Sequence, residues 1–215
     1  GDTNNRGDGA NEMGNNLSTI NLGTNRWVRS IVAGMFHNCA LLDNGTTKCW
    51  GQNSSGQLGQ GDPNHRGDGA SEMGDSLAVT DLGTNRSARS IIAGHDHNCA
   101  ILDNGTVKCW GRNNYGQLGQ SDTNNRGDGA SEMGNSLAVT DLGTNRSARS
   151  IIAGGYFNCA ILDNGAVKCW GRNDGGQLGQ GDTSSRGDGA SEMGDNLVAL
   201  NFGTNRTVRS LVAGG

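Results

Sequence analysis

Aromatic and apolar residues are scarce in this chain. Of its 215 residues, 4% are aromatic and 33% are hydrophobic, and there is a single proline against 38 glycines. This composition argues against one large hydrophobic core, and such a glycine excess usually indicates a low-complexity chain. Here the glycines recur at fixed places, which is typical of turn positions in an ordered fold.

Strong charge and long apolar runs are also missing. The formal net charge is −4 and the pI is near 5.5, so the composition gives no indication of a nucleic-acid partner. No apolar run approaches the roughly 18 residues of a membrane span. The chain begins at Gly1 with neither a Met nor a recognisable signal peptide, which favours a mature or excerpted segment.

Motifs of common enzymatic chemistry are absent as well. The sequence has no Gly-x-Ser-x-Gly nucleophile turn, no GxxxxGK[ST] phosphate loop and no HExxH zinc motif. Its four histidines (His37, His65, His95 and His97) do not recur at a common position of every repeat. The sequence therefore predicts a protein that is not an enzyme.

What the chain does have is a 60-residue period. The segment 90–119, SIIAGHDHNCAILDNGTVKCWGRNNYGQLG, has near-copies at 30–59 and 150–179, and a fourth copy starts at Ser210. A fixed period of this length is the signature of a tandem-repeat architecture. We predict a single repeat domain over 1–215 with about three and a half repeats: 1–60, 61–120, 121–180 and the partial repeat 181–215.

Each repeat is expected to be all-β. In the second repeat the sequence predicts strands at 77–82, 88–93, 97–102 and 106–110, separated by glycine-containing turns. No segment shows the i, i+3, i+4, i+7 pattern of a helix. A polar, turn-rich connector over 62–74 precedes these strands.

The last two strands form a hairpin whose register follows from its loop. A three-residue Asp-Asn-Gly loop centred on Asn104 places Cys99 opposite Cys109, within disulfide range. Reduced buried thiols and a zinc site are the alternatives. Disulfides indicate an oxidising compartment, so we expect an extracellular or cell-surface location. The same register in every repeat predicts three bridges: Cys39–Cys49, Cys99–Cys109 and Cys159–Cys169.

The string HNCAILDNGTVKCWGRNNYGQLG resembles the repeat of the regulator of chromosome condensation family, and it occurs three times with few changes. This resemblance implies a β-propeller with four-stranded blades, of which the family typically has seven. At this period a full ring needs roughly twice as many residues, so we expect an incomplete ring or an open repeat array. The paired cysteines resemble those of the family's secreted bacterial members.

Tryptophan and glutamine recur once in each whole repeat. Each tryptophan directly follows a cysteine in its strand, so it lies on the opposite face of the hairpin. There an aromatic ring can fill the gap between neighbouring blades. The glutamines lie between glycines, where they can cap exposed backbone between blades. These residues are Trp50, Trp110, Trp170, Gln57, Gln117 and Gln177.

Two short sets of positions differ among the repeats. One is Met35-Phe36-His37, His95-Asp96-His97 and Gly155-Tyr156-Phe157; the other is Ser54-Ser55, Asn114-Tyr115 and Asp174-Gly175. Both sets fall in turns between strands, where a propeller meets its partners. Drift among repeats without a functional role is the alternative. The candidate partner-binding residues are Phe36, His95, Asp96, Tyr115 and Tyr156.

The connector carries two further patterns. Asp122, Asn124, Asp128 and Glu132 place four oxygen-bearing side chains in a spacing that calcium loops use, although Arg126 occupies a ligand position of the usual loop. Calcium is therefore a possible ligand, and a carboxylate-capped turn is the alternative. The Arg-Gly-Asp tripeptide of each connector is predicted to be a local turn rather than an integrin motif.

Nearly identical repeats favour periodic contacts. We expect a non-catalytic extracellular scaffold that mediates protein–protein contact or self-assembly into a surface or fibre-like structure. Its partners are expected to be further copies of itself, the continuation of its own chain, or another protein. The alternative is a secreted binding propeller that captures or inhibits one protein target. The family that the repeat resembles includes a secreted inhibitor of β-lactamase.

Overall fold

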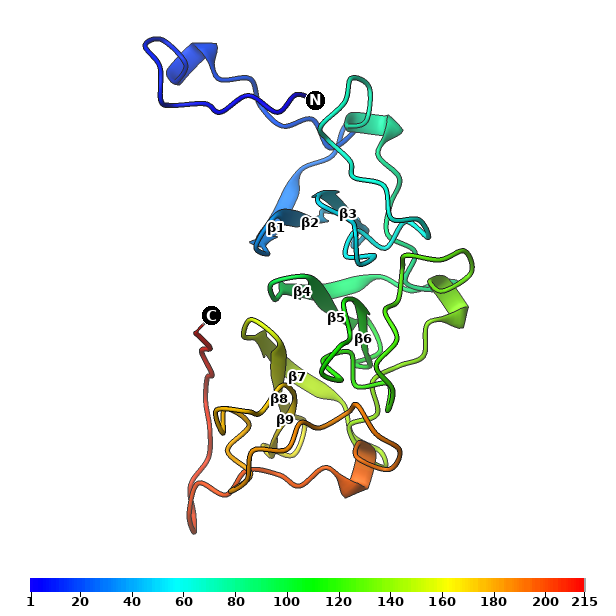
Figure 1. The fold of residues 1–215 in the computed structure, drawn as a ribbon, viewed down its shortest axis with the longest axis vertical. Helices are drawn as coiled ribbons and strands as arrows, with labels where there is room; N and C mark the ends of the chain where they lie inside the picture. The colour runs from blue at the N-terminus through cyan, green and yellow to red at the C-terminus, as the bar shows by residue number, and fades with distance from the viewer. Residues whose placement is uncertain (215) are drawn as a thin grey trace.

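The computed structural model describes residues 1–214 and holds three three-stranded antiparallel sheets that follow one another along the chain (Figure 1). Short 3-10 helices lie in the connectors beside the sheets. No helix among the described residues has the length and apolarity to cross a membrane. The elements are η1 (Gly14–Asn16), β1 (Val28–Ala33), β2 (His37–Leu42), β3 (Thr47–Gly51), η2 (Gly74–Ser76), β4 (Ala88–Ala93), β5 (His97–Leu102), β6 (Val107–Gly111), η3 (Gly134–Ser136), β7 (Ala148–Ala153), β8 (Phe157–Leu162), β9 (Val167–Gly171) and η4 (Gly194–Asn196).

Each sheet has three strands, so the prediction of four-stranded blades is wrong. The segment 77–82 was the expected additional strand, and it belongs to no sheet. Its buried side chains are Leu77, Thr80 and Leu82, and the step of three from Leu77 to Thr80 breaks the alternation of a strand. The Thr80 N–H donates instead to the Thr47 carbonyl of the preceding repeat at 2.9 Å. The segment therefore links two repeats rather than widening one sheet.

The outer edge of each sheet carries only an isolated bridge. Gly111 and Arg126 exchange two backbone hydrogen bonds of 2.8 and 3.1 Å, and the other repeats have the same bridge. Gly127 follows with φ of 97°, a conformation that turns the chain away from the edge and that favours glycine. The connector therefore touches the sheet once and leaves before a strand can form.

The hairpin register is the one that the loop predicts. In the second repeat Cys99 pairs with Cys109 and Ala100 with Lys108, and the other two hairpins follow the same register. All six cysteines are buried and bonded within their own repeats, as Cys39–Cys49, Cys99–Cys109 and Cys159–Cys169.

Replacing Cys99 and Cys109 together by alanine is expected to lower the free energy of unfolding by about 2–3 kcal/mol, because each bridge constrains only a short loop of the unfolded chain. Chemical denaturation under non-reducing conditions measures the change. Peptide mapping without reductant is the companion test, and a bridge between two different repeats contradicts the register.

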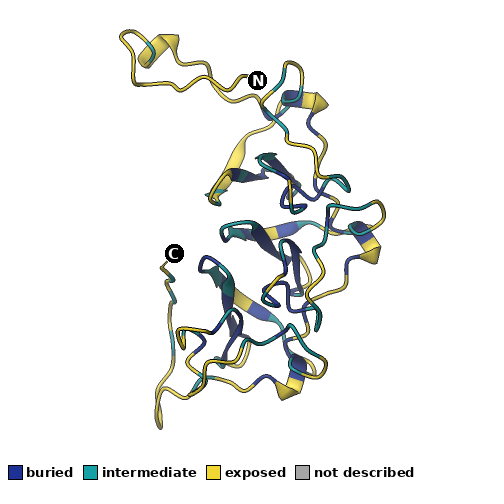
Figure 2. Cartoon of the chain, viewed as in Figure 1, coloured by how far each residue is buried: buried dark blue, intermediate teal, exposed yellow. Residues whose placement is uncertain are grey.

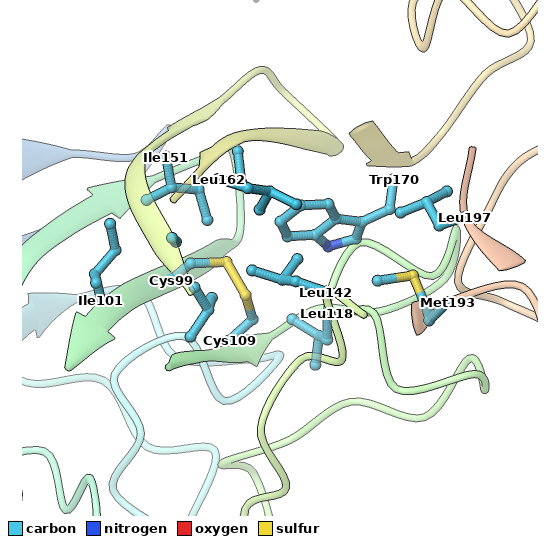
Figure 3. Close-up of a cluster of buried hydrophobic side chains, with 13 residues drawn as sticks. Cys99, Ile101, Cys109, Leu118, Leu142, Ile151, Leu162, Trp170, Met193 and Leu197 are labelled. Atoms are coloured by element: carbon cyan, nitrogen blue, oxygen red, sulfur yellow. A yellow bond between two sulfur atoms is a disulfide. The ribbon is translucent and has the colours of Figure 1, made fainter. Parts of the chain in front are cut away.

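The hydrophobic core lies between neighbouring sheets rather than within one sheet (Figure 3). The Cys99–Cys109 bridge and Leu118 of the second repeat meet Leu162 and Trp170 of the third. An equivalent cluster around Trp110 joins the first and second repeats. We call these interfaces the first seam (repeats one and two) and the second seam (repeats two and three). Trp110 and Trp170 are 0% exposed, which confirms that tryptophan fills the gap between blades.

Backbone of one repeat is bound by side chains of the next at each seam. Trp110 Nε1 and Asn98 Nδ2 both donate to the Gln57 carbonyl, at 3.1 and 2.7 Å. Gly56 also lies so close to the backbone of Asp128, in the connector that is bridged to the second sheet, that a Cβ atom has no room there. The Gln57 side chain caps its own turn, accepting from the Ser55 N–H at 2.9 Å, so the carbonyl rather than the side chain spans the seam.

Candidate protein-binding surface

The two variable loop sets lie at the same end of the hairpins. In the second repeat the Arg112 N–H, just after β6, donates to the Asp96 carbonyl between β4 and β5 at 2.9 Å, and the other repeats have the same bond. Adjacent repeats are joined through these loops too, because Met35 N–H donates to the His95 carbonyl and His95 N–H to the Gly155 carbonyl, each at 2.9 Å. The variable positions therefore share one edge of the stacked sheets.

Five side chains gather across the second seam, and we call them the tyrosine–arginine cluster: His95, Arg112, Tyr115, Tyr156 and Arg172. The centroids of the two tyrosine rings are 5.6 Å apart, and the His95 ring meets Tyr156 edge-on at 4.9 Å. The Arg172 guanidinium lies 5.2 Å from the Tyr115 ring centroid and 5.8 Å from that of Tyr156, and Arg112 lies 5.5 Å from Tyr156. These aromatic and cation–π contacts hold the cluster in one arrangement.

Two carboxylates flank the cluster. Asp96 lies 3.5 Å from Arg112 Nη1, and Asp174 forms an ion pair with Arg172. The hydrogen bond between the latter pair lowers the pKa of Asp174 and raises the pKa of Arg172. Each guanidinium has five N–H donors, so these contacts leave donors free. Half-exposed tyrosine and arginine side chains are the types that dominate binding energy at protein interfaces.

The structure brings together four of the five candidate partner-binding residues. His95, Tyr115 and Tyr156 are in the cluster and Asp96 borders it, whereas Phe36 lies on the first repeat with 62% of its surface exposed. The first seam has Ser55 at the position of Tyr115, so it has no tyrosine pair.

Sequence reasoning missed two members of the cluster, Arg112 and Arg172. Both stand where the first repeat has Gln52. This change from a neutral to a charged side chain, beside the variable turns, was the available signal.

Buried histidines adjoin the same loops and hold the seams. His97 Nε2 lies 3.0 Å from Asn158 Oδ1, and Asn158 Nδ2 donates to the Gln117 carbonyl at 2.7 Å. Because a carbonyl oxygen can only accept, Nε2 carries the proton, and the buried Nδ1 has no partner among residues 1–214. Burial lowers the pKa of His97 to about 4 and also lowers that of His37, its counterpart at the first seam. These histidines are therefore neutral structural groups.

The carboxylates of the connector are occupied by the protein's own donors. Asp122 pairs with Arg126 at 2.6 Å, and Glu132 accepts from the backbone N–H groups of Gly127 and Gly129 at 2.9 and 2.8 Å. Asp128 accepts at 3.3 Å from the amide of Asn125, next to Asn124. Within the described part of the chain no three His, Cys, Asp or Glu side chains converge as a metal site. Calcium binding stays a prediction, and it requires the Arg126–Asp122 pair to open.

The arginine of every Arg-Gly-Asp tripeptide is also held locally. It pairs with the aspartate four residues earlier, at 2.6 to 2.8 Å, in each of the four connectors. The tripeptide is thus part of a hydrogen-bonded turn, as the sequence predicts.

Comparison with known sequences identifies the repeated unit. Residues 28–57, 89–117 and 149–177 match the regulator of chromosome condensation (RCC1) repeat. The chain is similar to the ultraviolet-B receptor UVR8 of Arabidopsis thaliana, with 33% identity over 159 residues, which are 74% of this chain and 32% of that protein. It is also similar to the probable E3 ubiquitin-protein ligase HERC4 of Homo sapiens, with 30% identity over 157 residues, 72% of this chain and 13% of that protein. It therefore spans only a minor part of each relative.

Solved structures show the same fold. Human WBSCR16 superposes with a TM-score of 0.61 at 21% identity, covering 86% of this chain and 42% of that one. Yeast RCC1 (Prp20), in its complex with Kap60, gives a TM-score of 0.55 at 21% identity, covering 74% of this chain and 36% of that one. Since the three matched segments coincide with the three sheets, the chain is built from repeats of the RCC1 family.

Proposed function

We propose that the chain is a non-catalytic repeat scaffold that binds a protein partner through the tyrosine–arginine cluster. The supporting observation is the convergence of two tyrosines, two arginines and a histidine from neighbouring repeats. Such side chains supply much of the binding energy of protein interfaces, and loops on a rigid scaffold are where binding residues concentrate. Protein binding is also recorded for Prp20, which was solved bound to Kap60.

The proposed setting is extracellular or at a cell surface. Three buried disulfides in a chain without free cysteine among its described residues support this, because disulfides persist in oxidising compartments.

The proposed architecture is one repeat domain that forms an incomplete ring or an open array of blades and that assembles with further repeats. Each sheet contacts only its neighbours in the chain, which is the arrangement of repeat proteins and supports growth by addition of like units.

A second candidate is a secreted binding propeller that captures one protein target. It is favoured by the restriction of the tyrosine pair to the second seam, since a purely periodic scaffold needs no such difference between seams. The two candidates differ in stoichiometry: a target-capturing protein binds one partner per chain, whereas a periodic scaffold binds along its length.

The test replaces the two tyrosines with the residues that the chain itself carries at the first seam. Tyr115→Ser copies Ser55, and Tyr156→Asp copies Asp96. The wild-type chain is used to capture partners from the secreted proteins of its natural source, and the affinity of each captured protein is then measured for both chains. We expect the double variant to bind roughly 100-fold more weakly, because two interface anchors are lost.

Val79→Ser and Val139→Ser form the matched control, since both side chains are exposed and lie outside the cluster. Unchanged affinity of the cluster variant, or equal losses in cluster variant and control, contradicts the proposal. The proposal is also contradicted if the wild-type chain retains no protein.

A further inference from the structure

A cavity of about 420 Å³ lies between the second hairpin and the connector that follows it, and its volume is in the range of small-molecule sites. Gly134, Leu137 and Thr140 of this connector are buried and the residues between them are exposed, so the connector packs on the hairpin while its outer side faces solvent (Figure 2). The polar residues of the cavity wall are Thr84, Arg86, Asn104, Thr106, Lys108 and Asn135.

The wall holds two cations and no carboxylate. Lys108 is only 6% exposed, and its Nζ donates to the Leu82 and Gly134 carbonyls at 3.0 and 2.7 Å. An ammonium group has three donors, so one N–H of Lys108 has no acceptor among residues 1–214. Arg86 Nη1 pairs with Asp103, and the Nε and Nη2 groups of Arg86 have no acceptor in the same part of the chain.

The carboxylates that act on these cations stand outside the wall. Asp103 is 2.8 Å from Arg86 Nη1. Burial lowers the pKa of Lys108, and the charge of Asp81 opposes that shift. Asp81 itself accepts from the Gly83 N–H at 2.8 Å. The surface that meets a ligand is therefore positive.

The other two hairpins have a carboxylate at this position of the following connector. Asp75 and Asp195 stand where the second hairpin faces Asn135. Hydrogen bonds from Thr24 and the charge of Lys48 lower the pKa of Asp75, and the pKa of Asp195 is lowered in the same way. Only the second hairpin, among the three described, has an amide in place of this negative charge.

The amide also reverses one hydrogen bond. The Thr24 hydroxyl donates to Asp75 at 2.5 Å, and the third hairpin has the same bond. The Thr84 hydroxyl instead accepts from Asn135 Nδ2 at 2.8 Å. This orientation of the amide follows from the Thr84 N–H, which donates to Asn135 Oδ1 at 3.0 Å. The hydroxyl proton of Thr84 is thus left to donate to a ligand.

Asn104 adds further donors at the tip of the hairpin. Its Oδ1 accepts from the N–H and the hydroxyl of Thr106, at 3.1 and 2.8 Å, and its Nδ2 has no acceptor among residues 1–214. Free donors therefore predominate on the wall. Such a wall complements a ligand rich in acceptor oxygens, above all a carboxylate, because hydrogen bonds to a charged acceptor are the strong ones.

We propose that this cavity binds a sugar acid, a pyranose ring that carries a carboxylate, either free or as one residue of an acidic polysaccharide. The carboxylate lies against Arg86 and Lys108. The neutral donors of Thr84 and Asn104 require oxygen atoms beyond the carboxylate, and ring hydroxyls supply them. Ala138 and Val139 give an apolar part of the wall on which the C–H groups of the ring pack.

This site is separate from the protein-binding surface. The cavity wall includes the hairpin tip at Asn104, whereas the tyrosine–arginine cluster lies at the other end of the hairpins. All wall residues lie between 84 and 139, so the repeats on both sides of the cavity are present in full. The inference goes beyond the proposed function and does not rest on it.

Isothermal titration calorimetry of the intact chain with sodium galacturonate tests the proposal. We expect one site per chain, and at least about tenfold weaker binding of galactose, which lacks the carboxylate, and of acetate, which lacks the ring. An oligogalacturonide distinguishes the two sources of the ligand: tighter binding than galacturonate indicates a polysaccharide, and equal or weaker binding indicates the free sugar acid. The proposal is overturned if neither compound binds, or if galactose or acetate binds as tightly as galacturonate.

Asn135→Asp is the most direct variant, because it copies the residue that the chain carries beside its other two hairpins and therefore suits the fold. It adds a negative charge and takes up the Thr84 hydroxyl, so galacturonate is expected to bind at least about tenfold more weakly. Asn114→Asp is the matched control. It copies Asp174, makes the same change in charge at the other end of the hairpins, and should leave the affinity unchanged. Equal affinity of the Asn135 variant and the wild-type chain overturns the site.

Asp75→Asn makes the reciprocal change at the first hairpin. It is expected to raise the stoichiometry from one galacturonate per chain to two, and a stoichiometry that stays at one contradicts the role given to the amide. The other polar residues of that wall already match those of the second hairpin: Thr24, Arg26, Asn44, Thr46 and Lys48.

The cluster variant separates this inference from the protein-binding proposal. Tyr115→Ser with Tyr156→Asp should bind galacturonate as the wild-type chain does, whatever its effect on a protein partner. If this variant loses the sugar acid while Asn135→Asp retains it, the cluster is the binding site and the assignment of the cavity is wrong.

Discussion

Trp110→Ala is expected to lower the free energy of unfolding by about 3–5 kcal/mol, the usual cost of truncating a fully buried large aromatic side chain. The ring is 0% exposed and packs in the cluster that joins the first two repeats. Its Nε1 also donates to the Gln57 carbonyl at 3.1 Å. Chemical denaturation followed by circular dichroism measures the loss.

Trp50→Ala is the matched control for this prediction. Trp50 occupies the same place in its repeat but is only half-buried, because no described repeat covers it. At a concentration where the chain is monomeric, we expect a clearly smaller loss than at Trp110. Equal losses contradict the assignment of the core to the seams, since they imply that each sheet forms its own core.

Acidification is expected to weaken the fold by about 3 kcal/mol through His97 alone. Burial lowers its pKa in the folded chain to about 4, whereas an exposed histidine titrates near 6.5. Between these values the unfolded chain binds a proton that the folded chain does not, so stability is lost as the pH falls from 6.5 to 4 and is unaffected by this group above 6.5. The buried Nδ1 has no acceptor for the added proton, which is the structural reason.

His97→Phe isolates this effect. The third repeat already has Phe157 at this position, packed over Gly154 as His97 packs over Gly94, so the hairpin accommodates the ring. The variant also loses the contact with Asn158, which lowers its stability at every pH and does not change the pH dependence. The melting temperature of the variant is expected to depend less on pH between 6.5 and 4, with His37 supplying the remainder in the same direction. Carboxylates whose pKa is lowered in the folded chain also weaken the fold when acid protonates them. Glu72, which accepts from the Gly69 and Gly67 N–H groups, is an example, and its effect is the same in the wild-type chain and in the variant. If the melting temperature of the variant falls between pH 6.5 and 4 by as much as that of the wild-type chain, the role of His97 is wrong.

The hairpins were predictable because local chemistry determines them. The Asp103-Asn104-Gly105 loop sets the register, and the same register aligns every cysteine pair. The alternation of Cys109 and Trp110 along one strand also assigns opposite faces to the bridge and the indole ring. Nothing beyond about fifteen residues of sequence is needed for these conclusions.

The fourth strand was mispredicted because a non-local contact decides its conformation. Residues 77–82 contain β-forming side chains, but Leu77 and Thr80 lie against the hairpin of the preceding repeat. The resulting step of three between these buried positions is incompatible with a sheet. A sequence read one repeat at a time does not reveal which repeat a segment packs against.

The sequence indicated which loops form the candidate surface, but not which side chains of those loops meet. Turns that vary on a constant framework indicated His95, Tyr115 and Tyr156, yet their convergence depends on how one sheet is placed on the next. The buried His97–Asn158 contact depends on the same placement, because its two partners are 61 residues apart. Phe36 shows the converse. It also lies in a variable turn and is 62% exposed, but no aromatic side chain among the described residues stacks on it.

Native-state hydrogen exchange, measured repeat by repeat on the monomeric chain, tests most directly the claim that stability comes from the seams. The three hairpins are nearly identical in sequence, so intrinsic exchange differs little among them. We predict that β5 and β6, which have a seam on both faces, exchange more slowly than β2 and β3 or β8 and β9, which have one. Equal protection of the three hairpins contradicts the account.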